Sequence, residues 1–139
     1  MSVEVLATAK LNLSLEVLGE TPHGFHELRT TMIAISLGDL VRADLSEERG
    51  VSLDLSGDFS KGVPKDESNL AVRAVLELLE RCGHSGGVRL ALEKRAPAGA
   101  GLGGGSADAA AALPAAREVL GLGEDTEMDE SILGALGSD

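Results

Sequence analysis

The stretch from Pro97 to Asp108, which reads PAGAGLGGGSAD, holds the residue types best suited to chemistry in this 139-residue chain, five of them glycine. Glycine tolerates positive φ and lets a ligand reach the main chain without meeting a Cβ. An alternating segment, 88–93, precedes the stretch and an alanine-rich segment follows it. This order predicts a strand, a loop and a helix start, which together direct backbone N–H groups at an anion. Ser106 is suited to cap that helix and to offer its hydroxyl to a phosphate or to the metal ion bound to it.

Two common nucleotide-binding loops fit this string poorly. The ordinary P-loop has Lys directly before Ser, and Gly105 stands there instead. The dinucleotide fingerprint G-x-G-x-x-G fits at Gly99, Gly101 and Gly104. It also needs a second strand with an acidic end about 20 residues later, and the chain there reads as helix and then as a glycine-containing loop.

A third loop type fits better. The phosphate loop of the GHMP kinases reads P-x-x-x-G-L-G-x-x-S, which matches Pro97, Gly101, Leu102, Gly103 and Ser106. A flexible glycine linker is the alternative without function, and the patterned flanks disfavour it.

The net charge of −11 argues against a general surface for nucleic acid or for an anionic membrane. A phosphate must then be bound by local donors, as in a backbone loop. Only two aromatic residues occur, Phe25 and Phe59, so the core must be aliphatic. The single cysteine, Cys82, predicts a buried thiol without an internal disulfide. Because no signal peptide or long apolar run is present, we expect a soluble cytoplasmic protein.

Hydrophobic periodicity predicts strands within 3–17, through 32–35, and over 40–45, 51–55 and 88–93. Helices are predicted from a cap at Ser68 or Asn69 to a stop at Gly83, from Ser106 or Ala107 onward, and over 127–136. Pro114 should kink the middle helix or divide it in two. The predicted fold is a single α+β domain over 1–139, with an antiparallel or mixed sheet covered by helices on one face.

Two further positions combine polarity with an unusual place. Lys10 and Asn12 fall on the polar face of the first strand, where a lysine either has a partner or reaches solvent at an edge. His26 stands at a strand entrance, where the pattern alone favours an ordinary polar residue without a functional role.

Three separated stretches now resemble one family. They are 7–13 (ATAKLNL), 23–28 (HGFHEL) and the glycine-rich stretch 97–108. Together they resemble the 4-diphosphocytidyl-2-C-methyl-D-erythritol kinases, which belong to the GHMP kinase superfamily. The resemblance covers the whole chain but only the first half of the family's proteins, whose second lobe is absent here. It implies an α+β fold similar to the second domain of ribosomal protein S5.

The resemblance also implies a reaction. ATP would donate its γ-phosphate, with Mg²⁺, to the 2-hydroxyl of the methylerythritol part of CDP-methylerythritol. Adenine would lie near Asn69 and Lys94, and Ser106 would contact the metal ion. The residues implied for ATP phosphates are Pro97, Ala98, Gly99, Ala100, Gly101, Leu102, Gly103, Gly104, Gly105, Ser106 and Ala107.

The substrate residues are implied in the same way. Lys10 and Asn12 would lie near the reacting hydroxyl, while Phe25 and His26 would bind cytosine. Gly-Ser-Asp at 137–139 matches the family's segment that carries the general base, so Asp139 would take the proton with Lys10 as its partner. A base at a chain end is poorly held, so we expect little activity from the 139 residues alone.

This sequence departs from the family at several positions: Phe25 replaces the usual Tyr, Ala107 replaces the usual Ser, and Pro114 interrupts a helix. Two other functions stay open: a nucleotide-binding module without catalysis, and a fragment of a dinucleotide-binding oxidoreductase. Lys10, Asn12 and Asp139 favour the kinase over the module, which needs none of them.

Overall fold

The computed structural model describes residues 2–20, 26–95 and 104–136, and of residues 8–20, 26–37 and 104 it describes the backbone only. Its elements follow one another as β1 (Ser2–Glu20), β2 (His26–Ser46), β3 (Gly50–Ser56), α1 (Leu70–Arg81), β4 (Gly87–Glu93), α2 (Gly104–Leu120) and α3 (Thr126–Leu136). The predictions that concern 97–103, Phe25 and Asp139 lie outside the described residues.

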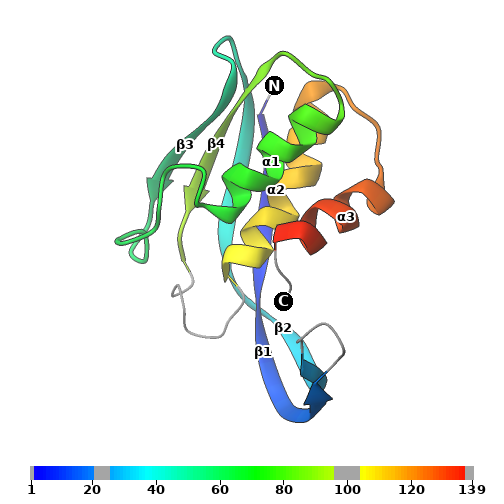
Figure 1. Ribbon diagram of the computed structural model, residues 1–139. Coiled ribbons are helices and arrows are strands. Elements are labelled where there is room, and N and C mark those ends of the chain that lie inside the picture. The colour runs from blue at the N-terminus through cyan, green and yellow to red at the C-terminus, as the bar shows by residue number, and fades with distance from the viewer. Residues whose placement is uncertain (1, 21–25, 96–103, 137–139) are drawn as a thin grey trace.

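The four strands form one mixed sheet in the order β1-β2-β4-β3. β2 is antiparallel to β1 and to β4, while β3 runs parallel to β4. The helices lie together on one face of this sheet (Figure 1). The predicted α+β arrangement is therefore confirmed.

The prediction of two strands through 32–35 and 40–45 is wrong, because both belong to the single long strand β2. The residues between the two predicted strands also pair with β1, since Ala7 lies opposite Asp39 and Thr8 opposite Gly38. Lys10 then pairs with Ala34, so extra residues of β2 are taken up as a bulge. Long-range pairing thus keeps the strand continuous where the sequence pattern is interrupted.

Helix α1 begins and ends where the sequence predicts. The Asn69 side chain caps it by accepting a hydrogen bond from the Ala71 N–H at 3.0 Å. Gly83 follows its end with φ of +61°, the left-handed conformation that favours glycine. Cys82, predicted to be buried, is only half-buried, because it sits at the C-terminal cap rather than within the apolar stripe.

Helix α2 begins at Gly104, two residues before the predicted start, and continues through Pro114 without division. Ala110, Pro114 and Glu118 form its exposed stripe, whereas most of the remaining positions of 108–119 are buried. A proline removes the hydrogen bond to the carbonyl four residues earlier. That carbonyl belongs to the exposed Ala110, where water can replace the lost donor, so the helix tolerates the proline.

The core lies between the helices and the covered face of the sheet. Small alanines of α2 let this helix pack closely against α1 and the strands. The fully buried larger side chains are Val41, Val75, Leu78, Val88, Leu90, Leu92, Leu113 and Ile132. None of the described helices is long and apolar enough to cross a membrane.

Candidate functional site

A pocket of about 280 Å³ lies where α2 begins, beside the end of β4 and the segment that leads into α1. It brings together residues from three distant parts of the sequence, including both predicted adenine neighbours, Asn69 and Lys94. The residues that line it are Lys61, Gly62, Val63, Pro64, Ser68, Asn69, Leu70, Lys94, Gly105 and Asp108.

Two residues of the pocket wall, Lys94 and Asp108, belong with Asp39 to a buried cluster of three ionisable side chains. The Lys94 Nζ donates hydrogen bonds of 2.6 Å to Asp39 Oδ2 and of 2.6 Å to Asp108 Oδ2. Each of the three residues is at most 3% exposed. The other oxygen of Asp39 accepts a 2.7 Å hydrogen bond from the Arg95 backbone N–H. The cluster therefore connects β2, the end of β4 and the first turns of α2.

Two acids share one lysine in this cluster, and burial makes any unbalanced charge costly. The pKa of Asp108 is raised to about 8, first because burial disfavours the carboxylate and second because Asp39 shares a hydrogen bond with it, although Lys94 acts in the opposite direction. Burial alone would lower the pKa of Lys94, but its hydrogen bonds to Asp108 and Asp39 outweigh burial and raise it. At neutral pH the cluster therefore holds a proton on Asp108 and is close to neutral.

Backbone packing fixes Lys94 from the other side. Its N–H donates to the Ser56 carbonyl at 2.8 Å, and its carbonyl accepts from the Phe59 N–H at 3.3 Å. Gly57 has φ of +96°, and a Cβ there would collide with the Lys94 carbonyl and lie 2.8 Å from its N atom. Glycine at position 57 thus lets the turn after β3 close directly onto Lys94.

Asn69 has a structural role in the pocket wall. Its Oδ1 caps α1, and its Nδ2 donates to the Pro64 carbonyl at 3.0 Å. It therefore fixes the 61–64 segment against the start of α1, and both side-chain groups are occupied.

The first turn of α2 offers the features of an anion site. The first N–H groups of a helix have no partner within the helix, and this turn, which includes Gly104, Gly105, Ser106 and Ala107, contains no acidic residue. Gly105 is exposed, and Ser106 and Ala107 are half-buried. A Cβ at Gly105 would meet only Leu70 Cδ1, at an ordinary 3.6 Å. The described protein therefore leaves open space at this backbone position.

The other predicted site residues are placed by backbone alone or not at all. Lys10 and Asn12 lie on β1 opposite Ala34 and Met32, a few residues from where Ala7 pairs with Asp39. His26 is the first residue of β2 and pairs with Glu20, at the far end of the β1–β2 ribbon, which extends past the helices (Figure 1). The register thus brings Lys10 toward the Asp39 cluster and does not bring His26 there.

Sequence reasoning assigned no role to Asp39 or Asp108. Asp39 was predicted only to begin the strand over 40–45, and Asp108 was read only as the end of the glycine-rich string. A signal was present nonetheless: Lys94 closes an apolar strand, and a lysine in such a place needs buried acceptors.

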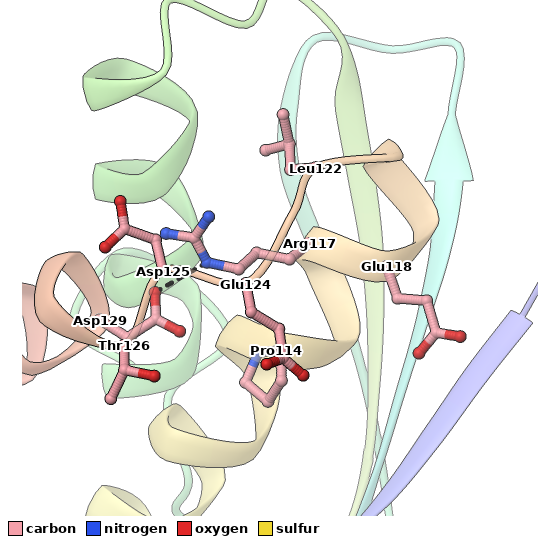
Figure 2. A pocket seen from close by; sticks show the side chains of 8 residues that line it. All are labelled: Pro114, Arg117, Glu118, Leu122, Glu124, Asp125, Thr126 and Asp129. Carbon is pink, nitrogen blue, oxygen red and sulfur yellow. Dashed lines mark hydrogen bonds and ion pairs between the residues drawn. The ribbon is translucent and has the colours of Figure 1, made fainter.

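A second pocket, of about 530 Å³, lies at the other end of α2 and is unsuited to phosphate (Figure 2). Its guanidinium, on Arg117, points toward Asp129 and binds Asp129 Oδ1 at 2.9 Å and the Gly123 carbonyl at 3.0 Å. The remaining charged residues of its wall are acidic and repel an anion. The residues that line it are Pro114, Arg117, Glu118, Leu122, Glu124, Asp125, Thr126 and Asp129.

Comparison with known proteins identifies the class. Residues 69–137, which contain α1, β4, α2 and α3, match the family described as GHMP kinases N terminal domain. The fold agrees with this family throughout: the structure of a homoserine kinase from Cytophaga hutchinsonii superposes with a TM-score of 0.75 over 97% of this chain and 40% of that chain, at 24% identity. The chain belongs to the GHMP kinases, and the alternative of a dinucleotide-binding oxidoreductase is excluded.

More specific likeness points to one enzyme within that class. The chain is 43% identical over 137 residues to the 4-diphosphocytidyl-2-C-methyl-D-erythritol kinase of Methylacidiphilum infernorum. The aligned residues make up 99% of this chain and 47% of that protein. A crystal structure of 4-(cytidine 5'-diphospho)-2C-methyl-D-erythritol kinase superposes with a TM-score of 0.73 at 40% identity, over 99% of this chain and 47% of that one. The chain thus corresponds to the N-terminal half of these kinases and spans about half their length.

Proposed function

We propose that this chain supplies the ATP-binding half of a kinase that phosphorylates the 2-hydroxyl of CDP-methylerythritol. The observation that carries the proposal is the start of α2, where the first helix N–H groups, a Gly105 that no described residue obstructs and a pocket of about 280 Å³ adjoin one another. Likeness to named kinases of this substrate supports the choice of acceptor.

In this proposal the triphosphate of ATP lies on the glycine-rich stretch 97–107, and the nucleoside occupies the pocket between the 61–64 segment and Lys94. The apolar walls, Val63, Pro64 and Leu70, suit a flat base. Ser106 would hold Mg²⁺ together with the phosphates, since Mg²⁺ usually takes few protein ligands beside phosphate oxygens and water. Among the described residues no group of three or more His, Cys, Asp or Glu side chains is placed to hold a metal ion. When bound, the ion would offset charge on the transferred phosphoryl group.

The acceptor side of the proposal rests on residues whose side chains are not described. Asp139 would accept the proton of the 2-hydroxyl, and Lys10 beside it would favour the carboxylate form and stabilise the transferring phosphoryl group. Asn12 would position the same hydroxyl, and Phe25 with His26 would recognise cytosine by stacking and hydrogen bonding. The cytoplasmic location expected from the sequence stays a prediction.

The ATP site is tested by calorimetry on the chain and on Gly105→Ala. The fold accepts a methyl group at this position, so the variant should unfold at the same or a higher temperature, because alanine favours helix more than glycine by about 1 kcal/mol. A phosphate lying against the backbone would meet that methyl group, so the Kd for ATP should rise at least tenfold. Gly134→Ala is the matched control, since Gly134 lies in α3 with no atom within 4 Å of its added Cβ. Equal ATP affinity in both variants would contradict the site.

The acceptor is tested by phosphoryl transfer from ATP. The chain and the chain joined to the second half of a relative are each offered CDP-methylerythritol, homoserine and mevalonate. Transfer to CDP-methylerythritol alone supports the proposal, while ATP binding with no transfer by the joined protein would leave a nucleotide-binding module.

A further inference from the structure

We infer that Asp39, Lys94 and Asp108 form a positioning unit that fixes both ends of the glycine-rich segment, so that Lys94 acts on the nucleotide site through its neighbours rather than by direct contact with ATP. This inference rests on the proposed function. The unit is described by its hydrogen bonds: Nζ of Lys94 binds one oxygen of each aspartate at 2.6 Å.

The geometry gives the unit its place. In the sequence, residues 96–103 follow Lys94 and Arg95 and precede α2, which begins at Gly104. Lys94 lies at the entry of this segment and Asp108 in α2 just beyond its exit, so the Lys94–Asp108 hydrogen bond joins the two ends directly. Asp39 holds the entry a second time, through Lys94 Nζ and the Arg95 N–H. Both ends are therefore tied to β2, a strand in the interior of the sheet.

Stability alone does not account for the unit. Side chains of Asp39, Lys94 and Asp108 are 1%, 3% and 4% exposed, so three ionisable groups lie in the interior. Replacement of buried ion pairs by residues without charge is often neutral or stabilising, because the desolvation cost disappears. The Asp108 Oδ1 adds to that cost, since it is buried without a hydrogen-bond partner among the described residues. What such a group supplies is a single defined arrangement of the elements it joins.

Lys94 is also poorly suited to contact ATP directly. Its ammonium has three donors, two of which are used by Asp39 and Asp108. The residue is 2% exposed, although it belongs to the pocket wall. Asp39 does not line the pocket. A change at Asp39 can therefore affect ATP only indirectly, through the groups that Asp39 contacts, among them Lys94 and the Arg95 N–H.

A double-mutant cycle on ATP binding tests the inference. Asp39→Ala, Lys94→Met and the double variant are compared with the unaltered chain by calorimetry at pH 7. Each single change should raise the Kd for ATP at least tenfold, and the double variant should lose no more than the weaker-binding single variant, because both changes break one unit. An Asp39→Ala variant that binds ATP as the unaltered chain does would show that Lys94 acts alone and would overturn the inference.

A charge-free variant separates positioning from folding. Asp39→Asn, Lys94→Met and Asp108→Asn together leave no unpaired charge, so this protein should keep its unfolding temperature and still lose at least tenfold in ATP affinity. Unchanged affinity would refute the inference. The control removes the Arg117–Asp129 ion pair at the other end of α2 with Arg117→Met and Asp129→Asn. Its ATP affinity should stay within twofold, and an equal loss there would assign the effect to general destabilisation.

The same measurements separate this inference from the proposed function. If the unaltered chain binds no ATP, the proposed function fails and the inference fails with it. If the unaltered chain binds ATP and the variants bind it equally well, only the inference is refuted.

Discussion

Replacing Asp108 by Asn should stabilise the protein, and the gain should depend on pH. The pKa of Asp108 is raised to about 8 in the folded chain, while an unfolded aspartate titrates near 3.9. Below about pH 4 both states hold the proton and the carboxyl has no differential effect. Between about pH 4 and 8 the unfolded state loses the proton while the folded state keeps it, so the free energy of unfolding of the wild type falls as pH rises. Asn has no proton to lose, so the variant lacks this decline.

The magnitude follows from the same numbers. About four units at about 1.4 kcal/mol per unit give a ceiling of about 6 kcal/mol, which is about 5 kcal/mol at pH 8, where the folded carboxyl is itself half-ionised. The amide introduces a second polar group that must find a partner beside the orphan Oδ1 position, which costs about 1–3 kcal/mol. We therefore expect Asp108→Asn to be more stable than the wild type by about 2–4 kcal/mol at pH 8, and by far less at pH 5.

Urea denaturation at pH 5, 7 and 9 measures this difference. It should grow from pH 5 to pH 8 and then level off. The exposed Asp54 on β3, changed to Asn, is the control and should show no such trend. A variant that is less stable than the wild type by the same amount at every pH would refute the assignment of a proton to Asp108 in the folded protein.

Three further changes test the fold around the site. Leu113→Ala should lower the free energy of unfolding by about 2–5 kcal/mol, because Leu113 is fully buried, whereas Leu45→Ala, at 55% exposure, should cost much less; similar losses would contradict the described core. Asn69→Ala should lower the free energy of unfolding by about 1–2 kcal/mol, measured by thermal unfolding, because the α1 cap is lost; an unchanged free energy would argue against the cap. Gly57→Ala should cost more than Gly62→Ala in chemical denaturation, since both have positive φ but only Gly57 would place its Cβ against Lys94, and equal costs would contradict that contact.

Local sequence patterns correctly predicted β3, β4 and α1, whose residues show a clear apolar periodicity. The alternation over 51–55 and 88–93 corresponds to β3 and β4 within one residue at each end, and the capped apolar stripe corresponds to α1. The unbroken β2 could not be predicted in this way, because the sequence pattern is interrupted at Gly38 and Asp39, where pairing with β1 keeps the strand continuous. Tertiary pairing decided that region, as it does wherever a strand crosses a weak local sequence.

The candidate site likewise has one part that local sequence predicted and one part that depends on tertiary pairing. The glycine-rich stretch and its flanking strand and helix are adjacent in sequence, so their order alone indicated a phosphate site. The Asp39–Lys94–Asp108 cluster joins residues 55 and 14 positions apart in the chain. No periodicity relates such positions, and only the register of β2 against β4, in which Leu40 pairs with Glu93, brings Asp39 to the end of the neighbouring strand.

Glycines in this chain occur for two different reasons, and the distinction bears on function. Gly57 and Gly87 are explained within the protein, because a Cβ would strike the backbone of Lys94 or of Glu48. Gly105 is not explained in this way: its added Cβ would make only an ordinary contact, and its helical position would favour alanine. Gly134 is also unobstructed, but it lies on the exposed face of α3 and far from any helix start. A helix-disfavouring residue at the first turn of α2, beside a pocket and with no reason for its small size among the described residues, is what close approach of a ligand to the backbone would require.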